Sequence, residues 1–291
     1  MNHFVKKVAL AVLPAVAIMI CPACKKDKKD EPTVKLIQLE TSETLGEHLV
    51  DKDGRALYYF SNDYNGQNNC QGNCALAWPV FSVDSLTADI LEEGLDFSDF
   101  SVITTADNKK QVTYKSWPLY YYSPSVNGTN VPEGSGTTTG ENVNGVWFVA
   151  KPDYTIMLVN AQLTGANGKT YKSDYTEGTG KTVYFSDPKG VTLYTYKNDK
   201  NNKNNFTDSA FAKNGSWPIY QTDKVVVPSA LDKSLFSSIN VFGKKQLTYK
   251  GWPLYYFGQD AGVRGSNKGV SVPSVAAWPV SVKNIAVAPA P

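Results

Sequence analysis

Cys70, Cys74 and His48 are the residues beyond the N-terminal leader whose side chains most readily bind a metal or react as nucleophiles. Three residues separate the two cysteines, a spacing that suits a structural disulfide, a redox-active pair or a soft copper site. His48 stands alone, so a zinc hydrolase, which needs several ligands, is not indicated. A Ser-His-Asp site would depend on His48 alone. We expect His48, which has apolar neighbours, to be a packing or surface residue.

Carboxylate pairs leave one class of enzyme open. Two carboxyl groups at a suitable separation can hydrolyse a glycosidic bond as general acid and general base. The chain contains such pairs, for example Glu92 with Glu93 and Asp96 with Asp99. Nothing in their spacing distinguishes them from acids on a solvated face. We therefore favour a protein that is not an enzyme, and we predict neither a cofactor nor a metal site.

The composition favours strands joined by turns. The chain has 291 residues, a length that fits two modest domains. It contains 17 tyrosines, 22 glycines and 16 prolines, which favours strands and tight turns over long helices. Net charge is +2 and much of that excess lies near the N-terminus, so the body is almost neutral. A neutral body argues against nucleic acid as a partner.

Residues 1–24 resemble a bacterial lipoprotein signal peptide. Lys6 and Lys7 precede an apolar segment, residues 8–20, that is too short to span a bilayer. In lipoproteins the peptide is cut before a cysteine that carries the lipid, and Ala23 is the small residue expected before Cys24. Cys21 is the alternative lipidation site, and an ordinary secretory signal is the alternative interpretation. The resemblance implies a membrane partner through a lipid at Cys24 and a charged tether over residues 25–35.

Export affects the interpretation of Cys70 and Cys74. Outside the cytoplasm a disulfide is the default state of such a pair. The loop that it would close is short, so the chain-entropy model gives a stabilisation of only about 2 kcal/mol. The alternative is a periplasmic redox or electron-transfer role for the pair.

An internal duplication organises the folded part of the chain. QVTYKSWPLYYYSPS, residues 111–125, is repeated as QLTYKGWPLYYFGQD, residues 246–260. Further matches keep the same order, so we divide the chain into a first half, residues 36–155, and a second half, residues 156–291. A Leu-Tyr-aromatic segment followed by Trp-x-Val/Ile occurs four times, which predicts two strand–turn units in each half. The units begin at Leu57, Leu119, Leu193 and Leu254.

Periodicity and turn residues predict the local structure. We expect strands at residues 57–60, 112–122, 191–196 and 247–257. Asp53-Gly54 and Lys189-Gly190 read as turns. Short helices are expected in the connections at residues 87–94 and 229–237, and loops at 126–144 and 198–205. Pro118 and Pro253 should mark a bend, a bulge or an edge strand.

A short motif in these units resembles that of a known family. The pattern Y-x-[FWY]-x-x-D occurs in three units, and it is similar to that of the bacterial secreted-repeat lipoproteins defined by this motif. That family has no known function. The second unit departs from the pattern, with Ser125 where the others have aspartate, and the second half lacks the cysteine pair. The motif residues are Tyr58, Phe60 and Asp63; Tyr194, Tyr196 and Asp199; and Tyr255, Phe257 and Asp260.

The motif has a structural and a functional interpretation. Each aspartate follows a strand and is expected to fix a local Asx-turn. The alternative is calcium binding, because Asp63 and Asp199 are each followed two residues later by asparagine. The motif aromatics should pack a core. Tyr59, Tyr121 and Tyr256 are the candidates for an exposed surface that stacks on a ligand.

The sequence thus predicts an all-β lipoprotein of the cell envelope with two tandem homologous halves. We expect a binding or structural module with a glycan or protein partner, anchored in the outer membrane and facing either the periplasm or the cell surface. The ligand, the membrane face, the role of the cysteine pair and the independence of the two halves are not determined by the sequence.

Overall fold

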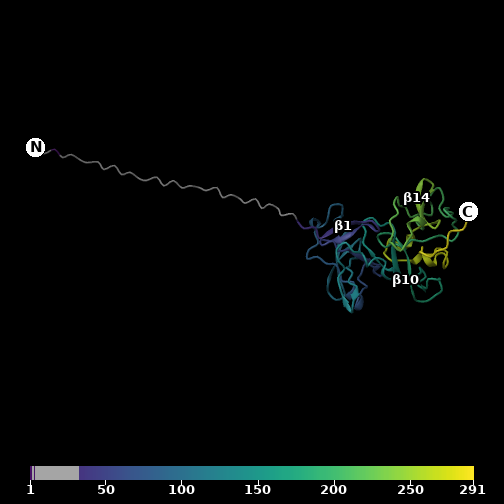
Figure 1. Ribbon diagram of the computed structural model, residues 1–291. Coiled ribbons are helices and arrows are strands. Elements are labelled where there is room, and N and C mark those ends of the chain that lie inside the picture. The colour runs from purple at the N-terminus through teal and green to yellow at the C-terminus, as the bar shows by residue number, and fades with distance from the viewer. Residues whose placement is uncertain (2, 4–32) are drawn as a thin grey trace. The chain divides into compact units, whose positions relative to one another are not determined.

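The computed structural model describes residues 1, 3 and 33–291, and residues 34–291 form one compact unit (Figure 1). The predicted signal peptide, the lipidation site at Cys24 and most of the tether lie outside the described residues. Among the residues that the structure describes, no helix is long and apolar enough to cross a membrane.

The predicted all-β class is confirmed, and the strands are short. The first half contains β1 (Ile37–Ser42), β2 (Gly46–Asp51), β3 (Tyr58–Phe60), β4 (Phe100–Thr104), β5 (Lys110–Tyr114), β6 (Trp117–Pro118), β7 (Ser125–Val126), β8 (Thr129–Asn130) and β9 (Trp147–Val149). The second half contains β10 (Met157–Thr164), β11 (Thr170–Tyr171), β12 (Lys181–Ser186), β13 (Phe236–Val241), β14 (Lys244–Tyr249) and β15 (Trp252–Pro253).

These strands pair into antiparallel sheets of two or three strands. The first half has the sheets β1-β2, β3-β9, β4-β5-β6 and β7-β8, and the second half has β11-β10-β12 and β13-β14-β15. The three-stranded sheets β4-β5-β6 and β13-β14-β15 occupy corresponding positions in the two halves, as the duplication requires. Pro118 and Pro253 lie in the edge strands β6 and β15, where a missing N–H is tolerated.

Within the described residues, helical structure is confined to short connections. The α-helix is α1 (Asn73–Ala77), which contains Cys74 and ends directly before Trp78. The 3-10 turns are η1 (Ser61–Asp63), η2 (Ala88–Ile90), η3 (Phe97–Asp99), η4 (Val143–Gly145), η5 (Lys233–Leu235), η6 (Gly258–Asp260) and η7 (Lys268–Ser271). The helices expected at residues 87–94 and 229–237 are therefore single turns, η2 and η5.

The repeated QxTYKxWPLYY segments are not continuous strands, so the prediction of strands over residues 112–122 and 247–257 is wrong. Lys115 and Ser116 both have positive φ, 48° and 62°. The corresponding residues of the second half, Lys250 and Gly251, also have positive φ, 49° and 81°. Two consecutive residues with positive φ form a tight hairpin turn. The chain therefore reverses between tyrosine and tryptophan. Alternating hydrophobicity continues through the turn and conceals it in the sequence.

The turns predicted at Asp53-Gly54 and Lys189-Gly190 are confirmed. Gly54 N–H donates to the carbonyl of Asp51 at 3.0 Å, and Gly190 N–H donates to that of Asp187 at 3.0 Å. Both glycines have positive φ, 75° and 80°, a conformation that other residues adopt at a cost.

The largest buried cluster joins the two halves. It consists mainly of second-half side chains but includes Tyr59, Trp117 and Phe148 from the first half. Alternation along β3 places Tyr59 opposite Tyr58 and Phe60, which belong to a different cluster. Because both faces of β3 are covered, Tyr59 is 0% exposed. Its predicted role in an exposed stacking surface is therefore wrong.

Arg264 links the halves from the second-half side. Its Nη1 donates to the carbonyls of Lys115 at 3.0 Å and Lys189 at 2.9 Å. Its guanidinium lies 4.4 Å from the ring centroid of Trp117, whose own Nε1 donates to the Pro188 carbonyl at 3.0 Å. A planar guanidinium can stack on an indole and donate to two carbonyls at the same time.

Replacing Arg264 with alanine is expected to lower the free energy of unfolding by about 1–3 kcal/mol, because the stacking on Trp117 and both hydrogen bonds are lost. Arg264→Lys should recover less than half of this loss, since an ammonium lacks the planar fork. Urea unfolding followed by circular dichroism measures both. A lysine variant as stable as the wild type would show that charge alone is sufficient.

Candidate functional site

Each half contains a stack of four aromatic rings, which we call the aromatic stack. In the first half Trp78 and Trp147 are parallel at 3.7 Å, with Phe60 on the outside of Trp147 at 4.0 Å and Tyr122 on the outside of Trp78 at 4.3 Å. In the second half, Trp217 and Trp278 lie 3.7 Å apart, with Phe257 and Tyr196 outside them at 4.4 Å each. The second aromatic position of the motif therefore supplies the outer rings.

The first tyrosines of the motif pair with each other across units. Tyr58 and Tyr120 exchange two backbone N–H···O bonds of 2.9 Å, and Tyr194 and Tyr255 exchange bonds of 2.8 and 2.9 Å. All four side chains are fully buried. Each half is therefore built from two units that face each other.

The motif carboxylates complete this pairing. Asp63 accepts from the hydroxyl of Tyr120 at 2.6 Å and from the backbone N–H of Asn69 at 2.8 Å. Asp199 accepts from Tyr255 and from the N–H of Asn205, both at 2.7 Å. Each carboxylate thus binds the tyrosine of the opposite unit and fixes a loop six residues ahead.

Asp260 makes the same kind of contact. It accepts from the Tyr194 hydroxyl at 2.5 Å, from Ser266 Oγ at 2.7 Å and from the N–H of Lys268 at 2.9 Å. The prediction of local Asx-turns is therefore wrong, because the motif carboxylates accept from backbone N–H groups that lie six to eight residues further along the chain. Donor hydrogens also face the motif carboxylates, which does not support the calcium alternative. Among residues 1, 3 and 33–291 no cluster of three metal-ligating side chains occurs.

Glu133 takes the place of the motif aspartate that is missing at Ser125. Its Oε2 accepts from the Tyr58 hydroxyl at 2.6 Å, and its Oε1 accepts from Thr139 Oγ1 at 2.7 Å and from the Thr139 N–H. Glu133 lies eight residues beyond Ser125 in the predicted 126–144 loop, so no spacing in the sequence identified it. The only indication of a substitute for the missing aspartate is that a buried Tyr58 hydroxyl needs a hydrogen-bond acceptor.

Burial changes the acidity of the motif carboxyls. It raises the pKa of Asp63 to about 7 and that of Asp199 to about 6, although each accepts two strong hydrogen bonds. The pKa of Asp260 is also raised by burial. Asp63 and Asp199 are 0% exposed. Such buried carboxyls cannot reach a substrate, so the motif aspartates serve the fold and are not themselves binding or catalytic groups.

The other stacking candidates, Tyr121 and Tyr256, also hold turns. The Tyr121 hydroxyl donates to Asp51 at 2.8 Å, and the Tyr256 hydroxyl donates to Asp187 at 3.0 Å. Both rings are half-buried. Arg55 pairs with Asp51 at 2.6 Å. Tyr121 and Tyr256 thus lie in matching structural positions, and their role in ligand stacking remains a prediction.

Two glutamines in the repeated segments were missed by the sequence reasoning. Gln111 is fully buried, donates to the Leu119 carbonyl at 2.9 Å and accepts from Asn68 at 2.7 Å. Gln246 does the same with Leu254 and Asn204, at 2.9 and 2.8 Å. The first residue of each QxTYKxWPLYY segment therefore holds the loop after the motif strand. The signal in the sequence was that glutamine begins both copies of this segment.

The predicted disulfide between Cys70 and Cys74 is confirmed, with 5.2 Å between the Cα atoms. At the position of Cys70, seven residues after the motif aspartate, the second half has Phe206, whose ring packs against Trp278 at 4.7 Å. The redox alternative remains a prediction. His48 is buried in β2 with Nδ1 3.1 Å from the Gly46 carbonyl oxygen, as expected of a packing residue.

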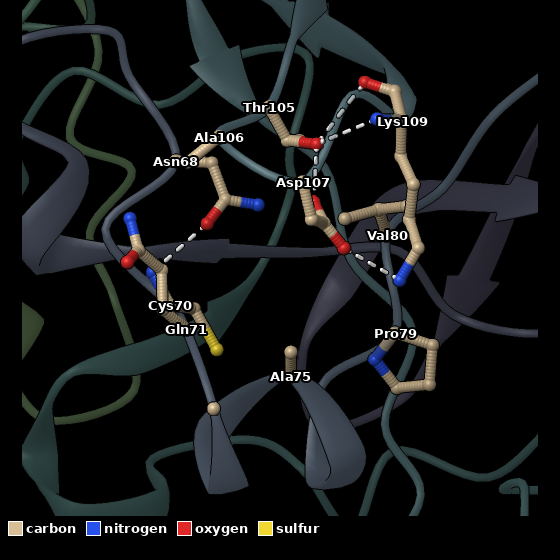
Figure 2. A pocket seen from close by; sticks show the side chains of 11 residues that line it. Asn68, Cys70, Gln71, Ala75, Pro79, Val80, Thr105, Ala106, Asp107 and Lys109 are labelled. Carbon is tan, nitrogen blue, oxygen red and sulfur yellow. Dashed lines mark hydrogen bonds and ion pairs between the residues drawn. The ribbon is translucent and has the colours of Figure 1, made fainter.

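A cavity of about 510 Å³ lies beside the disulfide, and we call it the first-half cavity (Figure 2). One wall comes from the loop around Cys70 and from Ala75 of α1. The opposite wall is the tip of the β4–β5 hairpin, where Thr105 Oγ1 donates to Asp107 at 2.6 Å and Lys109 pairs with Asp107 at 2.8 Å. Pro79 and Val80 add an apolar surface between the walls.

The second half differs at the corresponding place. The tip of the β13–β14 hairpin carries Phe242, which contacts Phe211 of the opposite loop with ring centroids 6.3 Å apart. Lys244 lies 4.3 Å from the Phe211 ring centroid. Phe211 and Phe242 both have positive φ, 52° and 47°, an unfavourable conformation for phenylalanine. In the second half two phenylalanine rings thus connect the loop of Phe211 to the β13–β14 hairpin. In the first half the polar side chains of the β4–β5 hairpin tip face a cavity instead.

Comparison with known proteins identifies the repeats. Two segments, residues 41–82 and 241–280, match the model of the family described as "Secreted repeat of unknown function". This agrees with the resemblance found in the sequence and indicates an extracellular or envelope location. The matches fall in different halves, consistent with the duplication. No curated protein and no solved structure matches the chain.

Proposed function

We propose that this protein, which carries two copies of a secreted repeat of unknown function, is a lipid-anchored, non-catalytic binding module of the cell envelope. The ligand site is the first-half cavity, and the ligand is an envelope glycan. The lipid is carried by Cys24, and residues 25–35 act as the tether between the membrane and the folded unit.

The observation that carries the proposal is the difference between the halves around this cavity. The two halves share one three-stranded sheet, the tyrosine–carboxylate contacts and the aromatic stacks, so these features do not require an open cavity. Where the second half brings Phe211 against Phe242, the first half has the polar tip formed by Thr105, Asp107 and Lys109. A feature that the duplicated fold does not need is the best candidate for function.

The lining of the cavity suits a saccharide. Its volume of about 510 Å³ is in the range of small-molecule sites. Asn68 and Gln71 add amides to the charged pair of Asp107 and Lys109, and these groups can exchange hydrogen bonds with hydroxyls. Pro79 supplies an apolar surface for the C–H face of a sugar ring. A protein partner is the alternative occupant, and it is an outcome of the test below.

Filling the cavity tests the proposal. Ala75→Trp places an indole in the space, and Leu76→Trp, at the next residue of α1, serves as the matched control because Leu76 is 61% exposed and does not line the cavity. Saccharides captured on a glycan array are titrated by calorimetry. We expect Ala75→Trp to weaken binding at least tenfold and Leu76→Trp to leave it unchanged.

Two results would contradict this assignment. If no saccharide on the array binds the wild-type protein, the ligand is not a glycan, and capture of an envelope protein that Ala75→Trp abolishes would indicate a protein partner. If a saccharide binds equally well to wild type and Ala75→Trp, with both variants folded by circular dichroism, the first-half cavity is not the site.

Anchoring has a separate test. Cys24→Ala in the full precursor is expected to move the protein from the membrane fraction to the soluble fraction, because removal of the lipid leaves no stable anchor. Cys21→Ala should leave the protein in the membrane fraction. Detergent phase partitioning measures both variants. The opposite pattern would assign the lipid to Cys21, and retention of both variants would argue against lipidation at either cysteine.

A further inference from the structure

The aromatic stack of the second half borders a cleft of about 440 Å³, which we call the second-half cleft. All four rings of the stack and Phe206 line it, together with Lys197 and Lys213. We propose that this cleft binds a small organic anion, a carboxylate attached to a six-membered ring. The site is separate from the first-half cavity and goes beyond the proposed function.

The residues beside the stack are smaller or more polar in the second half than at the same offsets in the first half. In the first half Ala77, Val143 and Val146 pack against the aromatic cluster that contains the stack. Ala77 directly precedes Trp78, whereas Val143 and Val146 lie four residues and one residue before Trp147. The residues at the same offsets from Trp217 and Trp278 are Ser216, Ser274 and Ala277, and all three line the cleft. Both stacks are buried, with Trp147 2% and Trp278 1% exposed, and in the second half the smaller residues beside the stack line a cleft.

The same comparison shows a gain of positive charge. Lys197 directly follows Tyr196 of the stack, where the first half has Ser61 after Phe60. Lys213 also lines the cleft, with its Nζ 4.8 Å from the ring centroid of Phe206. The residues that line the cleft include no aspartate or glutamate. In the part of the chain that the structure describes, neither lysine forms an ion pair.

The aromatic lining favours the same ligand charge. The edge of an aromatic ring carries partial positive charge, and its face carries partial negative charge. Trp217 and Trp278 each have a ring of the stack against both faces, so these two indoles can present only their edges to the cleft. Edges and ammonium groups both attract a carboxylate. The aromatic surroundings favour a ring as the rest of the ligand, and the volume suits one ring with its substituents.

Two sources share this chemistry, an aromatic acid and an acidic sugar, and the experiment distinguishes them. Benzoate and glucuronate are titrated against the full mature chain, with benzyl alcohol and glucose as uncharged counterparts. Calorimetry measures affinity, and a change in the fluorescence of the six tryptophans, which include Trp217 and Trp278, gives a second readout. We expect one of the two acids to bind at least tenfold more tightly than its uncharged counterpart. Which acid binds identifies the source.

Variants test the location of the site. Lys197→Glu and Lys213→Glu should each weaken binding about tenfold or more, because each replaces an attraction by a repulsion. Lys224→Glu, an exposed lysine that does not line the cleft, is the matched control. Ser274→Val introduces the first-half residue and should abolish binding without loss of fold, since the first half already accommodates valine at this offset.

The proposal is overturned if neither acid binds more tightly than its uncharged counterpart. It is also overturned if binding persists unchanged in Lys197→Glu, Lys213→Glu and Ser274→Val. Ala75→Trp, which fills the first-half cavity, should leave binding of the acid unchanged. The two sites can therefore fail or succeed independently.

Discussion

Replacing Trp278 with alanine should lower the free energy of unfolding by about 3–5 kcal/mol, the loss typical of a large aromatic side chain removed from a core. Trp278 is 1% exposed and contacts Trp217, Tyr196 and Tyr255. Its removal leaves a cavity that neighbouring rings cannot fill, because they are held by their own strands. Urea unfolding followed by circular dichroism measures the effect.

Two further variants make this result specific. Trp147→Ala in the first half should cost a similar amount, because Trp147 is stacked in the same way between Trp78 and Phe60. Trp252→Ala should cost much less, about 1–2 kcal/mol, since Trp252 is only half-buried and mainly donates its indole N–H to the Ala286 carbonyl at 2.8 Å. Equal losses for all three tryptophans would show that the aromatic stacks are not the main source of stability.

The motif carboxylates should have the next largest effect. Asp63→Ala is expected to cost about 2–4 kcal/mol, because the buried Tyr120 hydroxyl and Asn69 N–H both lose their acceptor. Glu133→Ala should be destabilising in the same way through Tyr58. Ser125→Ala is the matched control at the position where the motif expects aspartate. Since Ser125 is exposed and Glu133 holds Tyr58, this change should cost less than about 0.5 kcal/mol.

The raised pKa of Asp63 also predicts a pH dependence. The pKa rises from 3.8 to about 7 on folding, so between these values the folded state keeps a proton that the unfolded state releases. The corresponding stability is present below pH 3.8 and is lost as the pH rises towards 7, by at most about 1.4 kcal/mol per pH unit.

Asp63→Asn removes this contribution and isolates it. The unfolding free energy of the variant should change less between pH 4 and pH 7.5 than that of the wild type. Asp199, with a pKa of about 6, supplies part of the remaining dependence with the same sign. Thermal or urea unfolding across this pH range measures both curves. Parallel curves for the wild type and the variant would show that Asp63 is already ionised in the folded protein at low pH.

Much of the architecture could be predicted from the sequence because it depends on local patterns. The two QxTYKxWPLYY segments revealed the duplication, and tyrosine-rich segments between glycine and proline turns predicted an all-β fold. Asp53-Gly54 marked a turn, since a residue with positive φ is best supplied by glycine. Cys70 and Cys74 predicted a disulfide because an exported chain folds in an oxidising compartment. Each inference needed only neighbours in the chain or the chemistry of the environment.

The candidate sites depended on contacts between residues that lie far apart in the sequence. Asp63 meets Tyr120, and Glu133 meets Tyr58 in place of an absent motif residue, because buried hydroxyls must find an acceptor wherever the fold brings one. The burial of Tyr59 on the second face of β3 could not be foreseen from alternation alone, which separates two faces but does not say what covers each.

The sequence by itself thus determined the repeat, the strand-rich class and the cysteine pair, whose causes are local. Only the tertiary structure decided that the motif aspartates are buried in the fold and that the two halves have different cavities. The first-half cavity and the second-half cleft arise where loops from separate units approach each other. The space between such loops depends on side chains from both, and no single segment of the sequence contains that information.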